Sequence, residues 1–135
     1  MKISARGVYA LDIMLDIMEY GEKLPVAIKD VANRRDISNK YAEQIVSTLN
    51  FAGLVRSIRG PKGGYQATDK AKKETLGTIL RLTESVLKDD NQDVESDNLL
   101  LVQKELNTAI DNVLNKYTLT ELLEMKQAAG NDYVI

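Results

Sequence analysis

The chain has 135 residues, a length typical of one domain, with 18 Lys+Arg, 20 Asp+Glu and a net charge of −2. It contains no Cys and no His, which excludes disulfides, a cysteine nucleophile, cysteine-ligated zinc or iron–sulfur sites and histidine acid–base chemistry. Together with the lack of a convergent carboxylate pair, these absences argue against an enzyme. We therefore expect no catalytic residues, no metal ligands and no cofactor.

The two halves of the chain carry opposite charge. Residues 1–73 hold 13 Lys+Arg against 8 Asp+Glu, a net charge of +5, and residues 74–135 hold 5 against 12, a net charge of −7. Such asymmetry suggests contact with nucleic acid or a membrane surface, although two ordinary solvated surfaces that differ by chance explain it equally well. No apolar run reaches the roughly 18 residues of a membrane span, and no signal peptide is recognisable. We expect a cytoplasmic protein without membrane contact.

The first predicted helix spans about residues 5–20. Ser4 can act as its N-cap, and apolar residues cover most of its circumference, leaving a narrow polar stripe of Asp12, Asp16 and Glu19. A helix that is apolar on most sides is buried on several sides. We therefore expect this helix at the centre of the fold.

Two short helices and a hairpin are predicted next. The helices are expected at about 27–35 and 39–52, with Ser38 as the N-cap of the second. Residues 54–58 and 65–68 read as strands joined by a Gly- and Pro-rich turn. Three helices followed by a hairpin are the order of a winged helix-turn-helix, whose second helix of the pair enters the DNA major groove.

The C-terminal half is predicted to be helical. Helices are expected at about 75–86, 97–116 and 119–128, separated by an acidic polar linker at 88–98. A capping box, Thr118 to Glu121, opens the last helix, and Gly130 is expected to stop it.

An apolar stripe runs along the predicted helix 97–116. Its members recur at spacings of three and four residues: Leu99, Val102, Leu106, Ala109 and Val113. Two heptads are too few to distinguish a coiled coil from a core helix. The pattern nevertheless suits a helix that packs against its twin in a dimer.

The segment from Tyr41 to Tyr65, YAEQIVSTLNFAGLVRSIRGPKGGY, resembles the Rrf2 family of bacterial winged-helix regulators. The opening MKISARGVYA and the late TLTEL at 118–122 are also similar to that family, so the resemblance covers nearly the whole chain. Its most specific part is the wing sequence RGPKGGY, which starts at Arg59.

The resemblance implies a homodimer that is held together by the long helix 97–116 and binds a double-stranded DNA operator. It implies the following contacts: Ser38, Lys40, Tyr41, Glu43 and Gln44 in the major groove, Arg59, Gly60, Pro61 and Lys62 in the wing, and Lys2 and Arg6 at phosphates. Packing remains the favoured alternative for Tyr41, and Glu43 and Gln44 could be ordinary solvated residues. Asn50 stands where members often carry Arg, which removes one charge.

Cluster-binding members carry three Cys between the helices expected at 75–86 and 97–116, and this chain has none there. The resemblance is therefore to cluster-free members such as the cysteine metabolism repressor, controlled by a small molecule or a protein partner. The ending Tyr133, Val134 and Ile135 resembles the tail by which serine acetyltransferases enter cysteine synthase. The alternative for this tail is an apolar end that folds back on its own domain.

The sequence thus predicts a mostly α fold with a small β-hairpin wing. We expect a winged helix-turn-helix DNA-binding domain at 1–73 and dimerisation helices at 74–135, with a C-terminal tail at 130–135. The expected function is a homodimeric repressor of cysteine or sulfur metabolism genes. A protein-interaction module that has kept this fold but lost operator specificity is the alternative.

Overall fold

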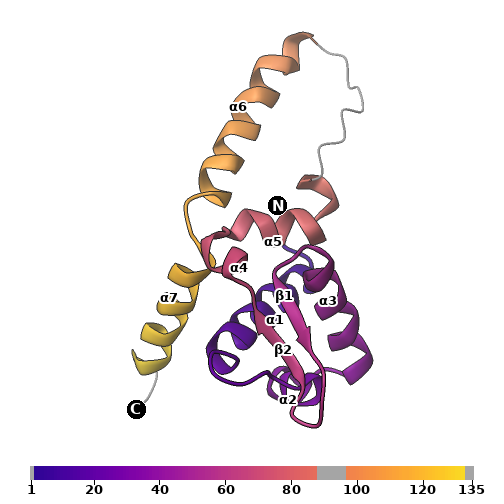
Figure 1. The fold of residues 1–135 in the computed structure, drawn as a ribbon. Helices are drawn as coiled ribbons and strands as arrows, with labels where there is room; N and C mark the ends of the chain where they lie inside the picture. The colour runs from indigo at the N-terminus through magenta and orange to yellow at the C-terminus, as the bar shows by residue number, and fades with distance from the viewer. Residues whose placement is uncertain (1, 88–96, 133–135) are drawn as a thin grey trace.

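The computed structural model describes residues 2–87 and 97–132, and it has the predicted class, mostly helical with one β-hairpin (Figure 1). The elements in chain order are α1 Ala5–Tyr20, α2 Ile28–Arg35, α3 Asn39–Phe51, β1 Val55–Ile58, β2 Gly64–Ala67, α4 Asp69–Lys73, α5 Leu76–Thr83, the 3-10 turn η1 Ser85–Leu87, α6 Asp97–Leu114 and α7 Leu119–Asp132. None of the described helices is long and apolar enough to cross a membrane.

The predicted helix caps are present. The Ser4 hydroxyl accepts a hydrogen bond from the Gly7 backbone N–H at 3.0 Å, and the Ser38 hydroxyl accepts one from the Tyr41 N–H at 3.1 Å. At the start of α7 the Thr118 hydroxyl accepts from the backbone N–H of Glu121 at 3.1 Å. These contacts satisfy donors that a helix start would otherwise leave unpaired, which is why the helices begin where the sequence predicts.

Helix α1 lies at the centre of the core, as expected from its apolar circumference. Ile13, Met14 and Ile17 are fully buried and belong to a cluster that also contains residues of α2, α3, β1, α5 and α7. Ile79 of α5 and Leu119 at the start of α7 are members of this cluster. The head formed by residues 2–73 therefore shares its core with the first parts of the C-terminal half.

The wing is an antiparallel hairpin with Val55 opposite Ala67 and Ile58 opposite Gly64. A backbone bridge adds Val26, whose N–H and C=O each pair with Tyr65 at 2.9 Å. This bridge brings the Val26 carbonyl so close to Gly64 that a Cβ there would lie 2.3 Å from it. Gly64 is thus required for the strand to approach the backbone that precedes α2.

The C-terminal half joins the head through a short backbone bridge and then departs from it. Leu76 N–H donates to the Tyr117 carbonyl, and Leu119 N–H donates to the Glu74 carbonyl, both at 2.9 Å. Helix α6 lies in the chain between the paired residues Leu76 and Tyr117, and it projects away from the rest of the molecule. Helix α7 returns alongside α1 (Figure 1).

The C-terminal helices differ from the prediction in their bounds. The helix expected at 75–86 ends at Thr83, because Glu84 takes an extended backbone and turns inward, where it accepts hydrogen bonds from the Ser4 backbone and hydroxyl. These bonds hold the pKa of Glu84 below its ordinary value. The sequence also did not predict the five-residue helix α4.

The last helix is longer than predicted. We expected Gly130 to stop it, but α7 continues to Asp132, so Gly130 is a helical residue and the tail does not begin there. Nothing lies within 4 Å of a Cβ built on Gly130, and its φ is not in the left-handed region of a capping glycine. The predicted linker also ends earlier, since Asp97 and Asn98 are helical, and positions 88–96 lie outside the described residues.

Candidate nucleic-acid interface

The outer face of α3 carries the polar residues that the sequence assigned to the major groove. Lys40, Glu43 and Gln44 are exposed, together with Ser47, while the opposite face of the helix is buried in the core. These four side chains and Arg6 of α1 line one shallow hollow. The structure therefore brings the predicted contacts Lys40, Glu43, Gln44 and Arg6 together on one surface.

Arg6 is held beside α3 by a hydrogen bond. Its Nη2 donates to the Thr48 hydroxyl at 3.0 Å, and that hydroxyl in turn donates to the Gln44 carbonyl at 3.2 Å. A guanidinium anchored at one end still has donors available for phosphate oxygens. Lys2 is exposed and lies four residues before Arg6, ahead of the start of α1.

Two of the predicted contacts have structural roles. The Ser38 hydroxyl serves as the N-cap of α3. Tyr41 is half-buried and packs edge-on against Tyr9, with ring centroids 5.7 Å apart and planes at 66°. This packing is the alternative that the sequence favoured for Tyr41, and the aromatic pair fixes α3 against α1.

The wing tip presents its cations to solvent. Arg59, Gly60, Pro61 and Lys62 are all exposed. Gly60 has φ +117°, a conformation that side chains rarely adopt, and its carbonyl accepts from the Gly63 N–H at 2.9 Å to close the turn. The turn thus holds Arg59 and Lys62 at the end of a two-stranded arm, with open space around Gly60.

Sequence reasoning missed an exposed aromatic residue at the end of α3. Phe51 is 96 % exposed, and its position is eleven residues after Lys40 and seven after Gln44. At 3.6 residues per turn this spacing places all three on the same face of the helix. The helical spacing itself was the signal that could have identified Phe51, because the core residues of α3 lie on the opposite face.

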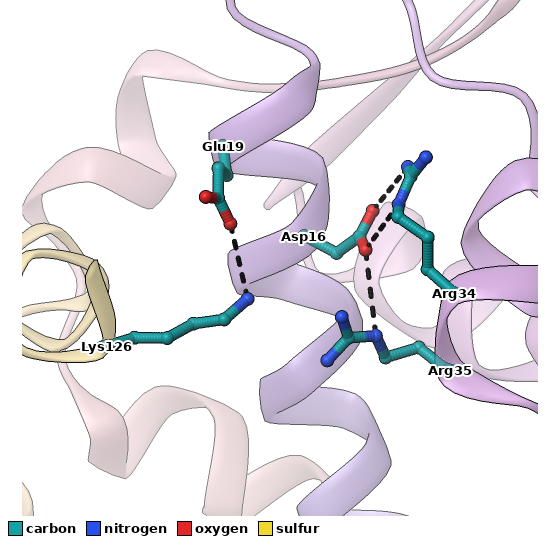
Figure 2. Close-up of polar contacts among 5 residues, drawn as sticks. All are labelled: Asp16, Glu19, Arg34, Arg35 and Lys126. Atoms are coloured by element: carbon teal, nitrogen blue, oxygen red, sulfur yellow. Dashed lines mark hydrogen bonds and ion pairs between the residues drawn. The ribbon is translucent and has the colours of Figure 1, made fainter. Parts of the chain in front are cut away.

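A buried ion pair fixes α2, the first helix of the helix-turn-helix pair, to α1. Asp16 is fully buried, and its two oxygens accept from Arg34 Nε at 2.9 Å and Nη2 at 2.8 Å (Figure 2). The Arg34 guanidinium also lies 4.2 Å from the centre of the Tyr20 ring. The hydrogen bond to Asp16 raises the pKa of Arg34, so this cation stays charged at any physiological pH.

The ion pair matters for the orientation of α3. Helix α2 ends at Arg35, and Asp36 follows in the left-handed region with φ 55° before Ser38 caps α3. Asp tolerates this conformation better than most residues, which permits a three-residue connection between the two helices. A fixed α2 therefore fixes the direction in which α3 starts.

Helix α6 has an unpartnered apolar face. The predicted stripe residues Leu99, Val102, Leu106 and Val113 are 52–58 % exposed, and Ala109 is also exposed. At the base of the helix Leu114 is buried, with its Cβ 3.0 Å from the position a Cβ would take on Gly77. The chain therefore packs only the end of α6 and leaves the stripe open among the described residues.

The tail residues predicted to contact a partner, Tyr133, Val134 and Ile135, lie outside the described residues. Their assignment therefore stays a prediction.

The family model of Rrf2, described as an iron-dependent transcriptional regulator, matches residues 3–125 of the chain. The residues of this chain do not fit an iron site. It has neither Cys nor His, and the described residues bring together no group of three metal-ligating side chains. Carboxylates alone do not hold iron–sulfur clusters, so no role for iron follows for this chain.

Known regulators are similar to the chain in sequence and in fold. The HTH-type transcriptional regulator IscR of Vibrio atlanticus is 34 % identical over 131 residues, covering 92 % of this chain and 76 % of the relative. CymR of Bacillus subtilis is 42 % identical over 84 residues, covering 62 % of this chain and 61 % of the relative. The solved structure of CymR, the global cysteine regulator of B. subtilis, superposes with a TM-score of 0.78 at 32 % identity, covering 93 % and 98 % of the two chains. The chain belongs to the Rrf2 family and is a winged helix-turn-helix transcriptional regulator.

Proposed function

We propose that two copies of this chain bind a pseudo-palindromic DNA operator through α3 and the wing, and that binding represses the adjacent genes. The main support for this proposal is one shallow hollow on the outer face of α3. Its lining residues are Arg6, Lys40, Glu43, Gln44 and Ser47. This surface offers cations for phosphates beside hydrogen-bonding groups for base edges, the combination that sequence-specific binding requires.

Each residue has a distinct task in this proposal. The Glu43 carboxylate accepts from a cytosine N4 amine, and Lys40 or Gln44 contacts the neighbouring base edges. Arg6, Lys2 and Lys62 neutralise phosphates. Arg59 enters the minor groove, whose negative potential is strongest where A·T pairs narrow it.

The wing assignment is tested by Arg59→Ala. We expect operator binding to weaken by about 1–3 kcal/mol and the preference for A·T pairs beneath the wing to relax, because one minor-groove cation is lost. A fluorescence titration of labelled operator at fixed salt measures both effects. Lys116→Ala, which removes an exposed cation from the C-terminal half, is the matched control and should bind as the wild type does. Equal affinities of the two variants would contradict the wing assignment.

Dimerisation is proposed for the stripe Leu99, Val102, Leu106, Ala109 and Val113. Its support is the exposure of this apolar face at heptad-like spacing. A two-fold symmetric dimer would place two α3 helices on successive half-sites, so the operator should have matching symmetry. It would also set two heads of charge +5 side by side.

For the regulated genes, we propose cysteine or sulfur metabolism. The support is the likeness to CymR together with the absence of Cys, which removes cluster and thiol chemistry as signals. We further propose that cysteine synthase is the partner and receives Tyr133, Val134 and Ile135. The support for this partner is the resemblance of these residues to the tail by which serine acetyltransferases enter cysteine synthase.

Deletion of Val134 and Ile135 tests the partner. We expect the truncated protein to lose retention by immobilised cysteine synthase while its operator affinity stays unchanged. The Arg59→Ala variant, with the tail intact, should show the reverse. Retention of the truncated protein by the enzyme would rule out the tail as the contact.

A protein-interaction module without operator specificity is the second candidate, because Asn50 and the charge of −7 in the C-terminal half weaken electrostatic binding. Salt dependence separates the two. A regulator with several phosphate contacts loses roughly tenfold or more in affinity for each doubling of salt. Binding that does not respond to salt would favour the interaction module.

A further inference from the structure

A charged hollow lies on the side of the molecule away from α3, where α1 and α2 end beside α7. Its volume is about 300 Å³, which is room for about ten water molecules or one small organic molecule. The residues that line it are Glu19, Tyr20, Arg35, Lys126, Gln127 and Gly130. In Figure 2 the Arg35 and Lys126 side chains extend toward α1 from α2 and α7, respectively.

The carboxylates at this place are already engaged by other cations. Both oxygens of Asp16 accept hydrogen bonds from Arg34, at 2.8 and 2.9 Å. Glu19 accepts from Lys126 Nζ at 3.3 Å. Arg35 Nε lies 3.7 Å from Asp16, which is beyond hydrogen-bond distance.

Arg35 therefore has one donor, Nε, that faces a carboxylate without forming a hydrogen bond to it. Its Nε is buried and has no hydrogen-bond acceptor within the described part of the chain. Packing holds the guanidinium in place, since its side chain is 22 % exposed, so its remaining donors are presented without first losing their freedom. Because the buried Nε faces Asp16, a ligand in the hollow would contact the other donors of the guanidinium.

The charge at the hollow indicates which acceptor fits. Arg34, Arg35 and Lys126 face two carboxylates, Asp16 and Glu19, which leaves one positive charge. A single carboxylate neutralises that charge and matches the two parallel donors of a guanidinium. A phosphate dianion would add an uncompensated negative charge next to Asp16 and Glu19.

We propose that this hollow binds a small organic carboxylate between Arg35 and Lys126. The ligand pairs with the Arg35 guanidinium and the Lys126 ammonium and so connects the end of α2 to α7. Because α2 leads directly into α3, occupancy of the hollow would also alter operator affinity, and this second step rests on the proposed DNA-binding function.

The Nε–H signal of Arg35 tests the site directly. In protein labelled with ¹⁵N-arginine, this signal is assigned by its disappearance in Arg35→Lys. We expect it to shift and saturate as sodium acetate is added, and to respond weakly and without saturation to sodium chloride at equal ionic strength. Identical responses to the two salts would overturn the proposal, and so would tighter binding of inorganic phosphate than of acetate.

Charge variants check the second cation. Lys126→Gln should weaken acetate binding about tenfold or more, because one of the two charge-assisted contacts is lost. Lys116→Gln, which changes an exposed lysine that does not line the hollow, is the matched control. Glu19→Gln removes a competing carboxylate and should strengthen binding, which keeps the proposal testable if Lys126→Gln fails to fold. Unchanged acetate affinity in both Lys126→Gln and Glu19→Gln would overturn it.

The coupling to DNA is measured by operator titration with and without acetate at constant ionic strength. A change in operator affinity in the wild type that is absent in Lys126→Gln supports the coupling, and an unchanged affinity overturns it. A protein that binds acetate but no operator would contradict the proposed DNA-binding function and leave the carboxylate site standing.

Discussion

The head and α6 differ in how far their apolar residues are exposed to solvent. In α1, Ile13 and Ile17 have no exposed surface, whereas Leu99 and Leu106 of α6 are more than half exposed. A single exposed leucine is ordinary on a protein surface, but a stripe of them along one helix indicates an interaction site. The comparison teaches that the chain buries α1 with its own residues, whereas the described residues leave the stripe of α6 uncovered.

The two regions also differ in how ion pairs attach their helices. In the head, Asp16 is fully buried and holds Arg34 from α2. At the base of α6, Arg81 and Asp111 pair at 3.0 Å with side chains that are 39 % and 59 % exposed. Exposed pairs contribute roughly 0–1 kcal/mol because water screens them, so this ion pair fixes the direction of α6 only weakly.

Among the substitutions considered, Leu106→Glu in α6 should produce the largest effect, and it acts on dimerisation. A charge in the centre of the stripe has to be desolvated in any α6–α6 contact, so we expect the dimer dissociation constant to rise by more than about a hundredfold. Sedimentation equilibrium measures the change. The head should keep its circular dichroism spectrum and its unfolding transition.

Lys104→Glu is the control for that experiment, because Lys104 lies on the opposite face of α6 from the stripe. A protein that remains dimeric with Leu106→Glu would show that α6 has another role. Equal dissociation constants for the two variants would lead to the same conclusion.

Asp16→Asn should produce the next largest effect, on the side of the head. It removes the buried charge that pairs with Arg34 and lies near Arg35, and both arginines then keep unpaired donors. Because these arginines are partly exposed, we expect a loss of about 2–3 kcal/mol, less than for a fully buried pair. Urea unfolding measures it, and Asp111→Asn should cost no more than about 1 kcal/mol. Equal costs would contradict the contrast between a buried and an exposed ion pair.

Much of this fold could be predicted because its determinants are local. Ser4, Ser38 and the pair Thr118 and Glu121 mark helix starts through hydrogen bonds that span three residues. The wing could be predicted because its turn requires Gly60 in a conformation open to few other residues.

The remainder depends on contacts between residues far apart in the sequence. In the sequence, Asp16 is one member of a polar stripe, and its neighbours do not distinguish it from Asp12. What distinguishes it is its contact with Arg34, which lies eighteen residues later in the chain. Helix α4 has a single buried residue, Ala71, so it shows no helical period. The end of α5 depends on Glu84 reaching Ser4 across the fold. The hollow at Arg35 and Lys126 is equally invisible in the sequence, because it forms only when α7 returns to α1.

Gly130→Ala should produce the smallest effect on stability, and its sign tests whether α7 continues past Gly130. Since Gly130 is helical, exposed and has no neighbour within 4 Å of an added Cβ, alanine should stabilise the protein by about 0.5 kcal/mol through helix propensity. A glycine that terminated the helix in the left-handed region would give the opposite sign, because alanine is strained there. Urea unfolding measures the free energy of unfolding of Gly130→Ala and of the reciprocal variant Ala129→Gly. If α7 extends through both positions, Gly130→Ala should stabilise the protein and Ala129→Gly should destabilise it. A loss of stability with Gly130→Ala would instead place the end of α7 at Gly130, where the sequence pattern had put it.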